Sequence, residues 1–147
     1  MPDEGDRLGH ELSAAIIRFH EALANRLALN VTEHKALDEI LYAGPTNPSE
    51  LAIRLGVSRA AVTKIVARLS DLGYVVGRTH AGDARRLDLV PTDAIREVMA
   101  ELYAPLSRNM AGLLDGLDEH QQRGVGLWLA GSIEALRSAA VALEEHG

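Results

Sequence analysis

The chain has 147 residues, of which 47% are hydrophobic and only 3% aromatic, a size that fits one domain or a compact fold with an added oligomerisation region. Because it contains no cysteine, disulfides, thiol nucleophiles, thiolate zinc sites and cysteine-based redox sensing are excluded. No uninterrupted apolar run approaches the ~18 residues that span a bilayer, and the first residues are acidic rather than basic. We therefore expect a cytoplasmic protein with an aliphatic interior and no membrane partner.

The net charge of −6 conceals a strong asymmetry along the chain. Residues 54–86 contain seven Lys or Arg and two acidic residues, a local charge of +5 that leaves −11 for the remainder. Proteins bind the phosphate backbone of nucleic acids chiefly through Lys and Arg, which displace counterions. A short basic segment in an otherwise acidic chain therefore favours a nucleic-acid partner.

Apolar residues recur at helical spacing towards both ends of the chain, which predicts long amphipathic helices over 7–30 and within 93–145. Pro105 lies inside the first C-terminal helix and is expected to bend it. The N-terminal stripe is Leu8, Leu12, Ile16, Phe19, Leu23 and Leu27, and the C-terminal stripes are Ile95, Val98, Met99, Leu102, Leu106, Met110, Leu113 and Leu117, then Val125, Leu129, Ile133, Leu136, Ala140 and Leu143.

Three shorter helices are predicted between these ends from their capping residues. Thr32, followed by an acid, predicts the start of one helix. Asn47 and Pro48 predict the start of the next, which ends at Gly56, the residue best able to adopt a positive φ. Ser58 caps the third, and Gly73 ends it.

Two strands follow, with a basic tip between them. Residues 74–76 are rich in β-branched side chains, and residues 87–90 alternate as a half-buried strand does. The polar stretch 77–86 is predicted to form a long tip between the two strands.

Two short helices joined at Gly56, the second one basic on its outer side, predict a helix-turn-helix. The second helix of such a unit enters the major groove, and its N-terminal residues reach base edges. Ser58, Arg59, Thr63 and Lys64 stand at those positions. Arg59 is the candidate for reading guanine, because its guanidinium can donate to O6 and N7, and Thr63 can contact a thymine methyl or a phosphate. Lys64 and Arg68 are candidates for phosphate contacts.

The basic tip suits a finger placed in a narrow minor groove, where negative potential attracts arginine. Arg85 is the candidate for insertion, with Arg78, His80 and Arg86 as further DNA contacts. Asp83 would be repelled by phosphate, so we expect it to accept hydrogen bonds from arginine or to cap the turn, orienting the tip. Its replacement by alanine is therefore expected to weaken DNA binding.

At these residues the sequence resembles the MarR family of bacterial transcriptional regulators, and the order of predicted helices agrees from Leu8 to Leu143. The motifs that carry the resemblance are Leu51-Ala52, Leu55-Gly56-Val57-Ser58, Val62-Thr63, Arg68-Leu69, Gly73-Tyr74-Val75, Arg78, Asp83-x-Arg85 and Val90-Pro91-Thr92. The tip His80-Ala81-Gly82 departs from many members, which carry a longer or more acidic stretch.

The resemblance implies a mainly α fold. Residues 32–91 would form a winged helix-turn-helix with a small β-hairpin wing, and residues 7–30 with 93–145 a helical dimerisation region. It also implies that Arg85 enters the minor groove and that the recognition helix enters the major groove of double-stranded DNA.

The terminal stripes independently predict a homodimer, because large exposed apolar patches are rare on soluble monomers. A two-fold dimer would read a pseudo-palindrome with half-sites ~10 base pairs apart. The alternative is that the stripes pack only within one chain.

MarR-like regulators often release DNA when a small, frequently aromatic acid binds between the dimerisation and DNA-binding regions. In this chain the resemblance implies a repressor with such a site bordered by the first, second and fifth helices. Its candidate residues are Phe19, His20, Leu23, His34 and Leu37. Histidine there could pair with a ligand carboxylate. The alternative is that Phe19, Leu23 and Leu37 are core residues and the histidines are exposed.

Two other classes of function compete with DNA binding. An enzyme is not expected, because the chain has no nucleophile elbow or phosphate loop. No cofactor or metal is expected, because the six histidines show no ligand spacing. A winged helix that binds or dimerises proteins without DNA affinity remains open, and salt dependence distinguishes it, since phosphate contacts weaken steeply with added salt.

Overall fold

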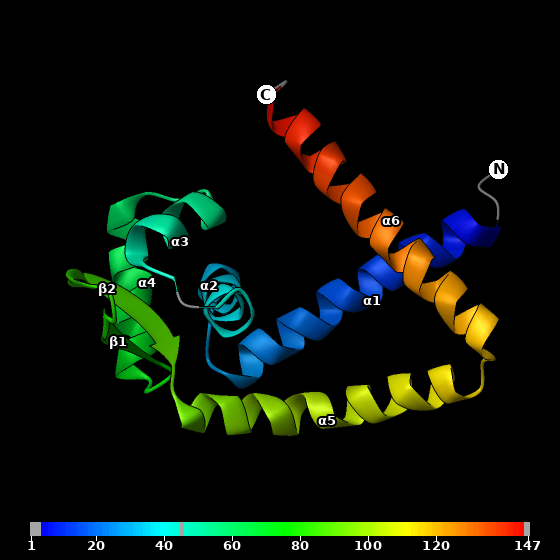
Figure 1. Ribbon diagram of the computed structural model, residues 1–147, viewed down its shortest axis with the longest axis horizontal. Helices are drawn as coiled ribbons and strands as arrows, with labels where there is room; N and C mark the ends of the chain where they lie inside the picture. Colours follow the sequence, from blue (N-terminus) through cyan, green and yellow to red (C-terminus); the bar gives the residue numbers. More distant parts are fainter. Residues whose placement is uncertain (1–3, 45, 146–147) are drawn as a thin grey trace. The chain divides into compact units, whose positions relative to one another are not determined.

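A computed structural model describes residues 4–44 and 46–145 as a mainly helical chain with one antiparallel hairpin (Figure 1), which confirms the predicted fold class. It divides into two compact units between Leu102 and Tyr103. The elements are α1 (Glu4–Arg26), α2 (Val31–Tyr42), α3 (Pro48–Leu55), α4 (Arg59–Asp71), β1 (Val75–His80), β2 (Asp83–Pro91), α5 (Asp93–Asp115) and α6 (Glu119–Glu145). Helix α5 continues through Pro105.

Helix α2 begins one residue before the predicted cap, so the prediction of Thr32 as its N-cap was wrong. Asn30 is the cap: its side-chain oxygen accepts from the Glu33 backbone N–H at 2.8 Å, and the Glu33 carboxylate accepts from the Asn30 N–H at 2.9 Å. This reciprocal capping box satisfies two backbone donors at once. A cap at Thr32 would leave Glu33 one residue into the helix, too early to return such a bond.

The helix-turn-helix forms where it was predicted. The Asn47 side chain caps α3 by accepting from the Glu50 backbone N–H at 3.0 Å, and the Ser58 hydroxyl caps α4 by accepting from Ala61 at 3.2 Å. Gly56 lies between the two helices with φ of 65°, a left-handed conformation that glycine adopts without steric cost. These three residues fix where each helix starts and how sharply the chain turns.

Helix α2 is the centre of the first compact unit (Figure 1), where it contacts α1, α3, α4 and β2. Its Leu37 is fully buried, together with Leu51 of α3, Leu69 of α4 and Leu89 of β2. Burying each such side chain contributes about 1.5–3 kcal/mol relative to exposure. One shared apolar core therefore holds the helix-turn-helix and the base of the hairpin together.

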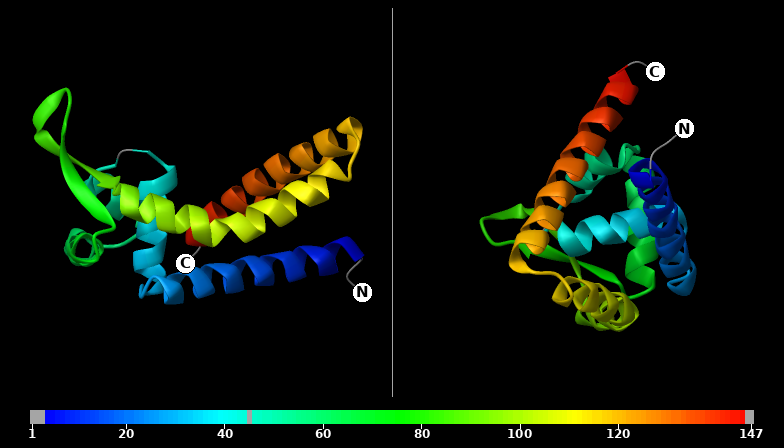
Figure 2. Two further views of the ribbon diagram at one scale, coloured as in Figure 1. Left: turned by 90° about the horizontal axis from the view of Figure 1, so that it is seen from below. Right: turned by 90° about the vertical axis from the view of Figure 1, so that its right-hand side faces the viewer.

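The hairpin extends away from the helix-turn-helix (Figure 2, left), and its tip is shorter than predicted. Regular pairing runs from Val75 opposite Pro91 to Thr79 opposite Leu87, and then shifts so that His80 pairs with Asp83. The prediction of a long tip over 77–86 was wrong, because most of those residues are in strands and only 81–82 form the turn. Polar composition concealed them, since both faces of this projecting ribbon are largely exposed.

The base of the hairpin is fastened to the chain just before α3. The Leu89 backbone N–H donates to the Thr46 carbonyl at 2.7 Å, forming an isolated antiparallel bridge, and the Thr46 side chain is buried. Gly77 lies so close to Leu87 that an added Cβ would stand 2.9 Å from its Cδ1. The wing is therefore oriented by backbone bonding at its base and by close packing across the strands.

The segment after α1 is bound to α4 and to the residue before β1. Ala28 has φ of 55°, an uncommon conformation for a residue with a side chain. Its carbonyl accepts from the Arg68 guanidinium at 3.5 Å, and the Leu27 carbonyl accepts from the Tyr74 hydroxyl at 3.1 Å. These contacts join the end of α1 to the last turn of α4 and to the residue before β1.

The terminal helices expose much apolar surface in the single chain. Helix α6 has no buried residue, and its Trp128 is 59% exposed. Among the helices that the structure describes, α6 is the one long and apolar enough to cross a membrane by length and composition, although Glu134 and Arg137 lie within it. Core helices of soluble proteins pass the same test. Exposed apolar residues of α1 are Leu8, Leu12, Ile16 and Ile17.

Candidate nucleic-acid interface

The predicted base-reading residues lie on the exposed side of α4. Arg59 is its first residue, and Thr63 and Lys64 follow one turn later; all three are exposed. The Ser58 hydroxyl accepts the N-cap hydrogen bond of α4, and the Thr63 hydroxyl donates to the Arg59 carbonyl at 3.0 Å. Arg59 and Lys64 therefore present charge from the outer face, whereas Ser58 and Thr63 have local hydrogen bonds to exchange before contacting DNA.

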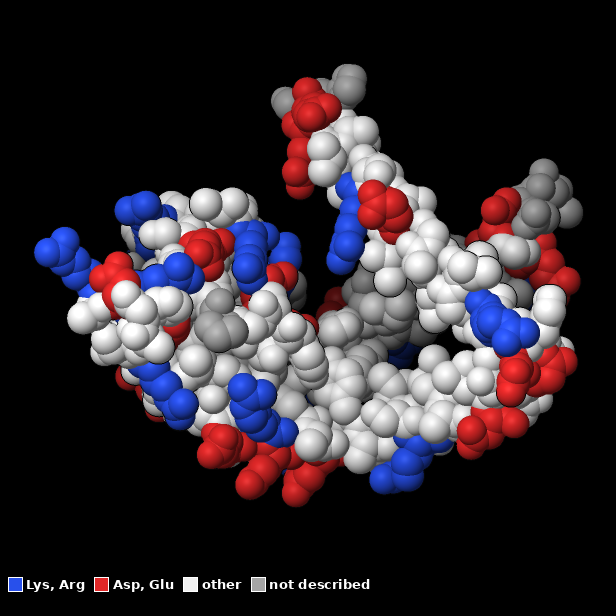
Figure 3. Space-filling model, viewed as in Figure 1, with Lys and Arg blue, Asp and Glu red and all other residues white. Residues whose placement is uncertain are grey.

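Basic side chains gather over α3, α4 and the hairpin in the space-filling view (Figure 3). Arg78 of β1 and Arg85 of β2 are exposed on the hairpin, while Arg68 is exposed near the end of α4. Because the Arg68 guanidinium also reaches Ala28, part of its function is structural. The basic residues of segment 54–86 therefore lie on one part of the fold, with acidic side chains among them.

Asp83 makes the turn contact that its position predicted. Its Oδ1 accepts a hydrogen bond from the Arg85 backbone N–H at 2.9 Å. Arg85 lies where the ladder register shifts between Thr79 and His80. Such irregularities bend a strand and redirect a side chain. Asp83 therefore fixes the backbone that carries the Arg85 guanidinium, instead of pairing with that guanidinium.

Arg86 and His80, both predicted as DNA contacts, bond to a carboxylate that the sequence reasoning missed. Asp88 is buried; its Oδ2 lies 2.6 Å from His80 Nδ1, and its Oδ1 accepts from Arg86 Nε at 3.1 Å. Arg86 also donates to Glu50 of α3 at 3.3 Å. This wing-base network, Glu50, His80, Arg86 and Asp88, connects the hairpin to α3 and gives the two basic residues a positioning function.

The predicted alternation of residues 87–90 pointed away from this network, because it placed Asp88 on the face opposite Leu87 and Leu89, the solvent face of a half-buried strand, whereas Asp88 is buried. Hydrogen bonding to His80, and then to Arg86, lowers the pKa of Asp88 below its ordinary value. Asp88 is therefore ionised throughout the neutral range, and its charge stabilises the base of the wing.

The five predicted ligand-site residues separate into two groups. Leu23 and Leu37 are buried core residues, and Phe19 is half-buried with its ring edge-on to His20. His20 and His34 line a cavity of about 240 Å³ between α1 and α2, together with Ile16, Ile17, Glu21, Ala24 and Val31. The expectation that α5 borders this space is not met by the lining residues. The alternative that the histidines are exposed was wrong for His34, which is 4% exposed.

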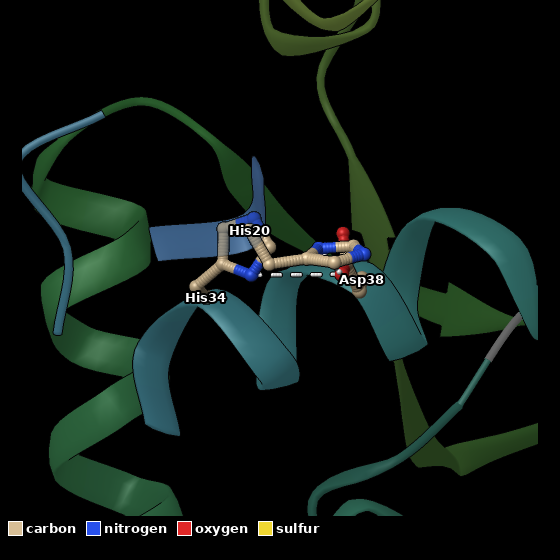
Figure 4. A group of neighbouring side chains, drawn as sticks. All are labelled: His20, His34 and Asp38. Atoms are coloured by element: carbon tan, nitrogen blue, oxygen red, sulfur yellow. Dashed lines mark ion pairs between the residues drawn. The ribbon is translucent and has the colours of Figure 1, made fainter. Parts of the chain in front are cut away.

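His34 belongs to a cluster with His20 and Asp38 (Figure 4), the second feature that sequence reasoning missed. Asp38 Oδ2 lies 3.6 Å from His20 Nδ1 and 3.5 Å from His34 Nδ1. Burial lowers the pKa of His34, although Asp38 opposes the shift, and burial raises the pKa of Asp38, although both histidines oppose it. The available signal was the four-residue spacing of His34 and Asp38, which places them on one face of α2.

A recognition helix capped by Ser58, a tight left-handed turn at Gly56 and a basic hairpin together define a winged helix-turn-helix protein. Comparison with known families matches residues 29–86 to the MarR family. The HTH-type transcriptional regulator YcgE of Bacillus subtilis is 35% identical over 107 residues, covering 73% of this chain and 70% of that protein.

Solved structures share the fold of this chain. A MarR-like transcriptional regulator from Thermotoga maritima superposes with a TM-score of 0.67 at 22% identity, covering 93% of this chain and 99% of that one. FabT of Streptococcus pneumoniae, solved in complex with DNA, has a TM-score of 0.63 at 20% identity, covering 92% and 99%. The chain belongs to the MarR family of transcriptional regulators.

The wing-base network predicts an acid-sensitive contribution to stability. Because Asp88 has a lowered pKa in the folded protein, its stabilisation is present above the ordinary carboxylate value of about 3.9 and is lost as the pH falls through the lowered pKa. Asp88→Asn should therefore lower the denaturant midpoint at pH 7, and the difference from the parent should narrow below about pH 4.

Urea unfolding at both pH values measures this, with Asp71→Asn as the control, since Asp71 is exposed at the end of α4. A difference for Asp88→Asn that stays the same in acid would contradict the contribution of its charge.

Proposed function

We propose that this regulator binds double-stranded DNA as a two-fold dimer, with α4 in the major groove and the hairpin tip in the adjacent minor groove. The observation that carries the proposal is that exposed cations occupy both elements, Arg59 and Lys64 on α4 and Arg85 on the hairpin, while one core holds both elements. Arginine donates to guanine O6 and N7 in the major groove and is attracted by a narrow minor groove. The DNA complex of FabT supports this use of the fold.

Dimerisation is the second part of the proposal. Apolar residues of α1 and α6 are exposed in the single chain, and contiguous patches of this kind mark interaction sites in soluble proteins. We assign both chain ends, residues 7–30 and 93–145, to a helical dimerisation region and residues 32–91 to the DNA-binding domain. On this proposal α6 is an interface helix of a cytoplasmic protein instead of a membrane span.

The third part is repression relieved by a small, aromatic acid. The cavity between α1 and α2 supports it, because apolar side chains form most of its wall and His20 and His34 supply polar groups. Imidazole can pair with a carboxylate when protonated. Addition of benzoate and related acids to a protein–DNA mixture would release the DNA if this assignment holds.

Replacing the two predicted groove arginines separates their contributions. Arg59→Ala should reduce the favourable free energy of DNA binding by about 1–3 kcal/mol and relax the preference for one sequence. Arg85→Ala should weaken binding and also reduce the slope of log K against log salt by ~1, if Arg85 neutralises phosphate charge along the minor groove. Fluorescence anisotropy with DNA from the region upstream of the chain's own gene measures both.

The matched control is Arg7→Ala, since Arg7 is an exposed arginine that pairs with Glu11 on α1 and lies outside the proposed DNA-binding domain. If the parent protein bound all DNA fragments equally and its affinity did not change with salt concentration, the chain would be better described as a winged helix that binds proteins.

Asp83→Ala should weaken DNA binding even though it removes a negative charge, because the Arg85 backbone loses its hydrogen-bond acceptor. The conservative control is Asp83→Asn, which keeps an acceptor oxygen at the same position and should retain most of the affinity. The same anisotropy titration measures both variants. Tighter binding by Asp83→Ala would show that charge repulsion outweighs the orientation of the tip.

Ile133→Arg tests the dimer, because Ile133 lies in the middle of the exposed apolar stripe of α6 and is 49% exposed in the single chain. The parent should sediment with the mass of two chains, and the variant should shift towards one chain and lose DNA affinity. Glu134→Gln, at the neighbouring position, should stay dimeric. A parent protein that sediments as one chain in dilute solution would reject the dimer.

A further inference from the structure

We propose that His20, His34 and Asp38 form a binding site for a divalent transition-metal ion such as Zn²⁺. The three side chains come from two helices, His20 from α1 and His34 with Asp38 from α2, and each offers one ligand atom within 4.8 Å of the others. Figure 4 shows the two imidazole rings and the carboxylate drawn together above α2. Two histidines and one carboxylate, with a water in the fourth position, are a common ligand set for zinc.

The spacing of the cluster fits a shared ion better than direct bonding. Asp38 Oδ2 lies 3.6 and 3.5 Å from the Nδ1 atoms of His20 and His34, whereas charge-assisted hydrogen bonds measure about 2.7–2.9 Å. Metal–ligand distances of about 2.0–2.1 Å in a tetrahedron place neighbouring ligand atoms ~3.4 Å apart. The same chain provides the contrast, because His80 and Asp88 approach to 2.6 Å, as a directly bonded pair does.

The hydrogen bonding around the cluster is incomplete for buried groups. His34 is 4% exposed, and neither its Nε2 nor Asp38 Oδ1 has a hydrogen-bond partner. Buried polar atoms are nearly always bonded, so each exception requires an explanation. An ion bound by Asp38 Oδ2 and the two imidazoles would compensate the charge of this half-buried carboxylate, whose described ion pairs are with His20 and His34 and include no Lys or Arg.

The adjoining cavity provides the open position that such a site needs. His20 and His34 line it, and its volume of about 240 Å³ has room for water or a small anion. An ion there would place positive charge beside a wall that is apolar apart from Glu21 and the two histidines, and would attract the carboxylate of an acid effector. The proposal itself does not depend on DNA binding, because the metal is measured with the protein alone.

The test uses the full chain, stripped of metal by a chelator and titrated with Zn²⁺ in competition with a coloured chelator. We expect one Zn²⁺ per chain. His20→Gln, His34→Gln and Asp38→Asn should each weaken affinity by more than about 100-fold, the upper end of losses caused by residues that only support a ligand. His10→Gln, which changes an exposed histidine elsewhere on α1, should bind as the parent does.

His20 is half-buried, so His20→Gln keeps the test decisive if the buried variants fail to fold, which circular dichroism monitors. Titration with Co²⁺ adds an independent readout, since its visible spectrum reports four-coordinate ligation and should disappear in His20→Gln. Absence of one-to-one Zn²⁺ binding by the parent, or affinity unchanged in His20→Gln, would overturn the proposal.

Discussion

The burial of α2 is the constraint on which the rest of the first unit depends. Its apolar side, Ala36, Leu37 and Ile40, is completely or almost completely buried, and it contacts α1, α3, α4 and β2. Cores are close-packed, so a shift of one element is felt by the others. Through this one helix, the recognition helix, the hairpin base and the end of α1 share a single core, from which the exposed cations Arg59, Lys64 and Arg85 project.

Surface chemistry then divides between contact and support. Arg59, Lys64 and Arg85 extend from the fold, whereas His80 and Arg86 are held by Asp88 and Glu50 at the base of the wing. Exposed ion pairs contribute little to the free energy of folding on average. They still fix the position of the side chains on a contact surface if one arrangement of those side chains is favoured over the others. Not every basic residue of segment 54–86 is therefore free to contact a phosphate, because Arg86 is already paired with acidic side chains.

The sequence predicted the helices, the turn at Gly56 and the caps at Asn47 and Ser58, because each depends on local chemistry within a few residues. Prediction from the sequence failed where a feature depends on a contact between residues far apart in the chain, or where one residue pattern fits two structures. Polar residues on a two-sided, exposed ribbon read as a loop, so the strands of the hairpin were too short in the prediction. Of the cluster of His20, His34 and Asp38, the family resemblance brought the two histidines to one site, but Asp38 was missed, since its approach to His20 depends on the packing of α1 on α2.

The linker after α1 has a mechanical consequence. The Leu27 carbonyl accepts a hydrogen bond from the Tyr74 hydroxyl, and the Ala28 carbonyl accepts one from the Arg68 guanidinium. Arg68 lies in the last turn of α4, and Tyr74 follows the end of that helix. These two hydrogen bonds, of 3.5 and 3.1 Å, are therefore a direct route by which a rotation of α1 would be felt at α4 and at the residue before β1. If the chain binds DNA as the proposed dimer, the distance between the two α4 helices would then depend on the orientation of α1, which lies outside the proposed DNA-binding domain.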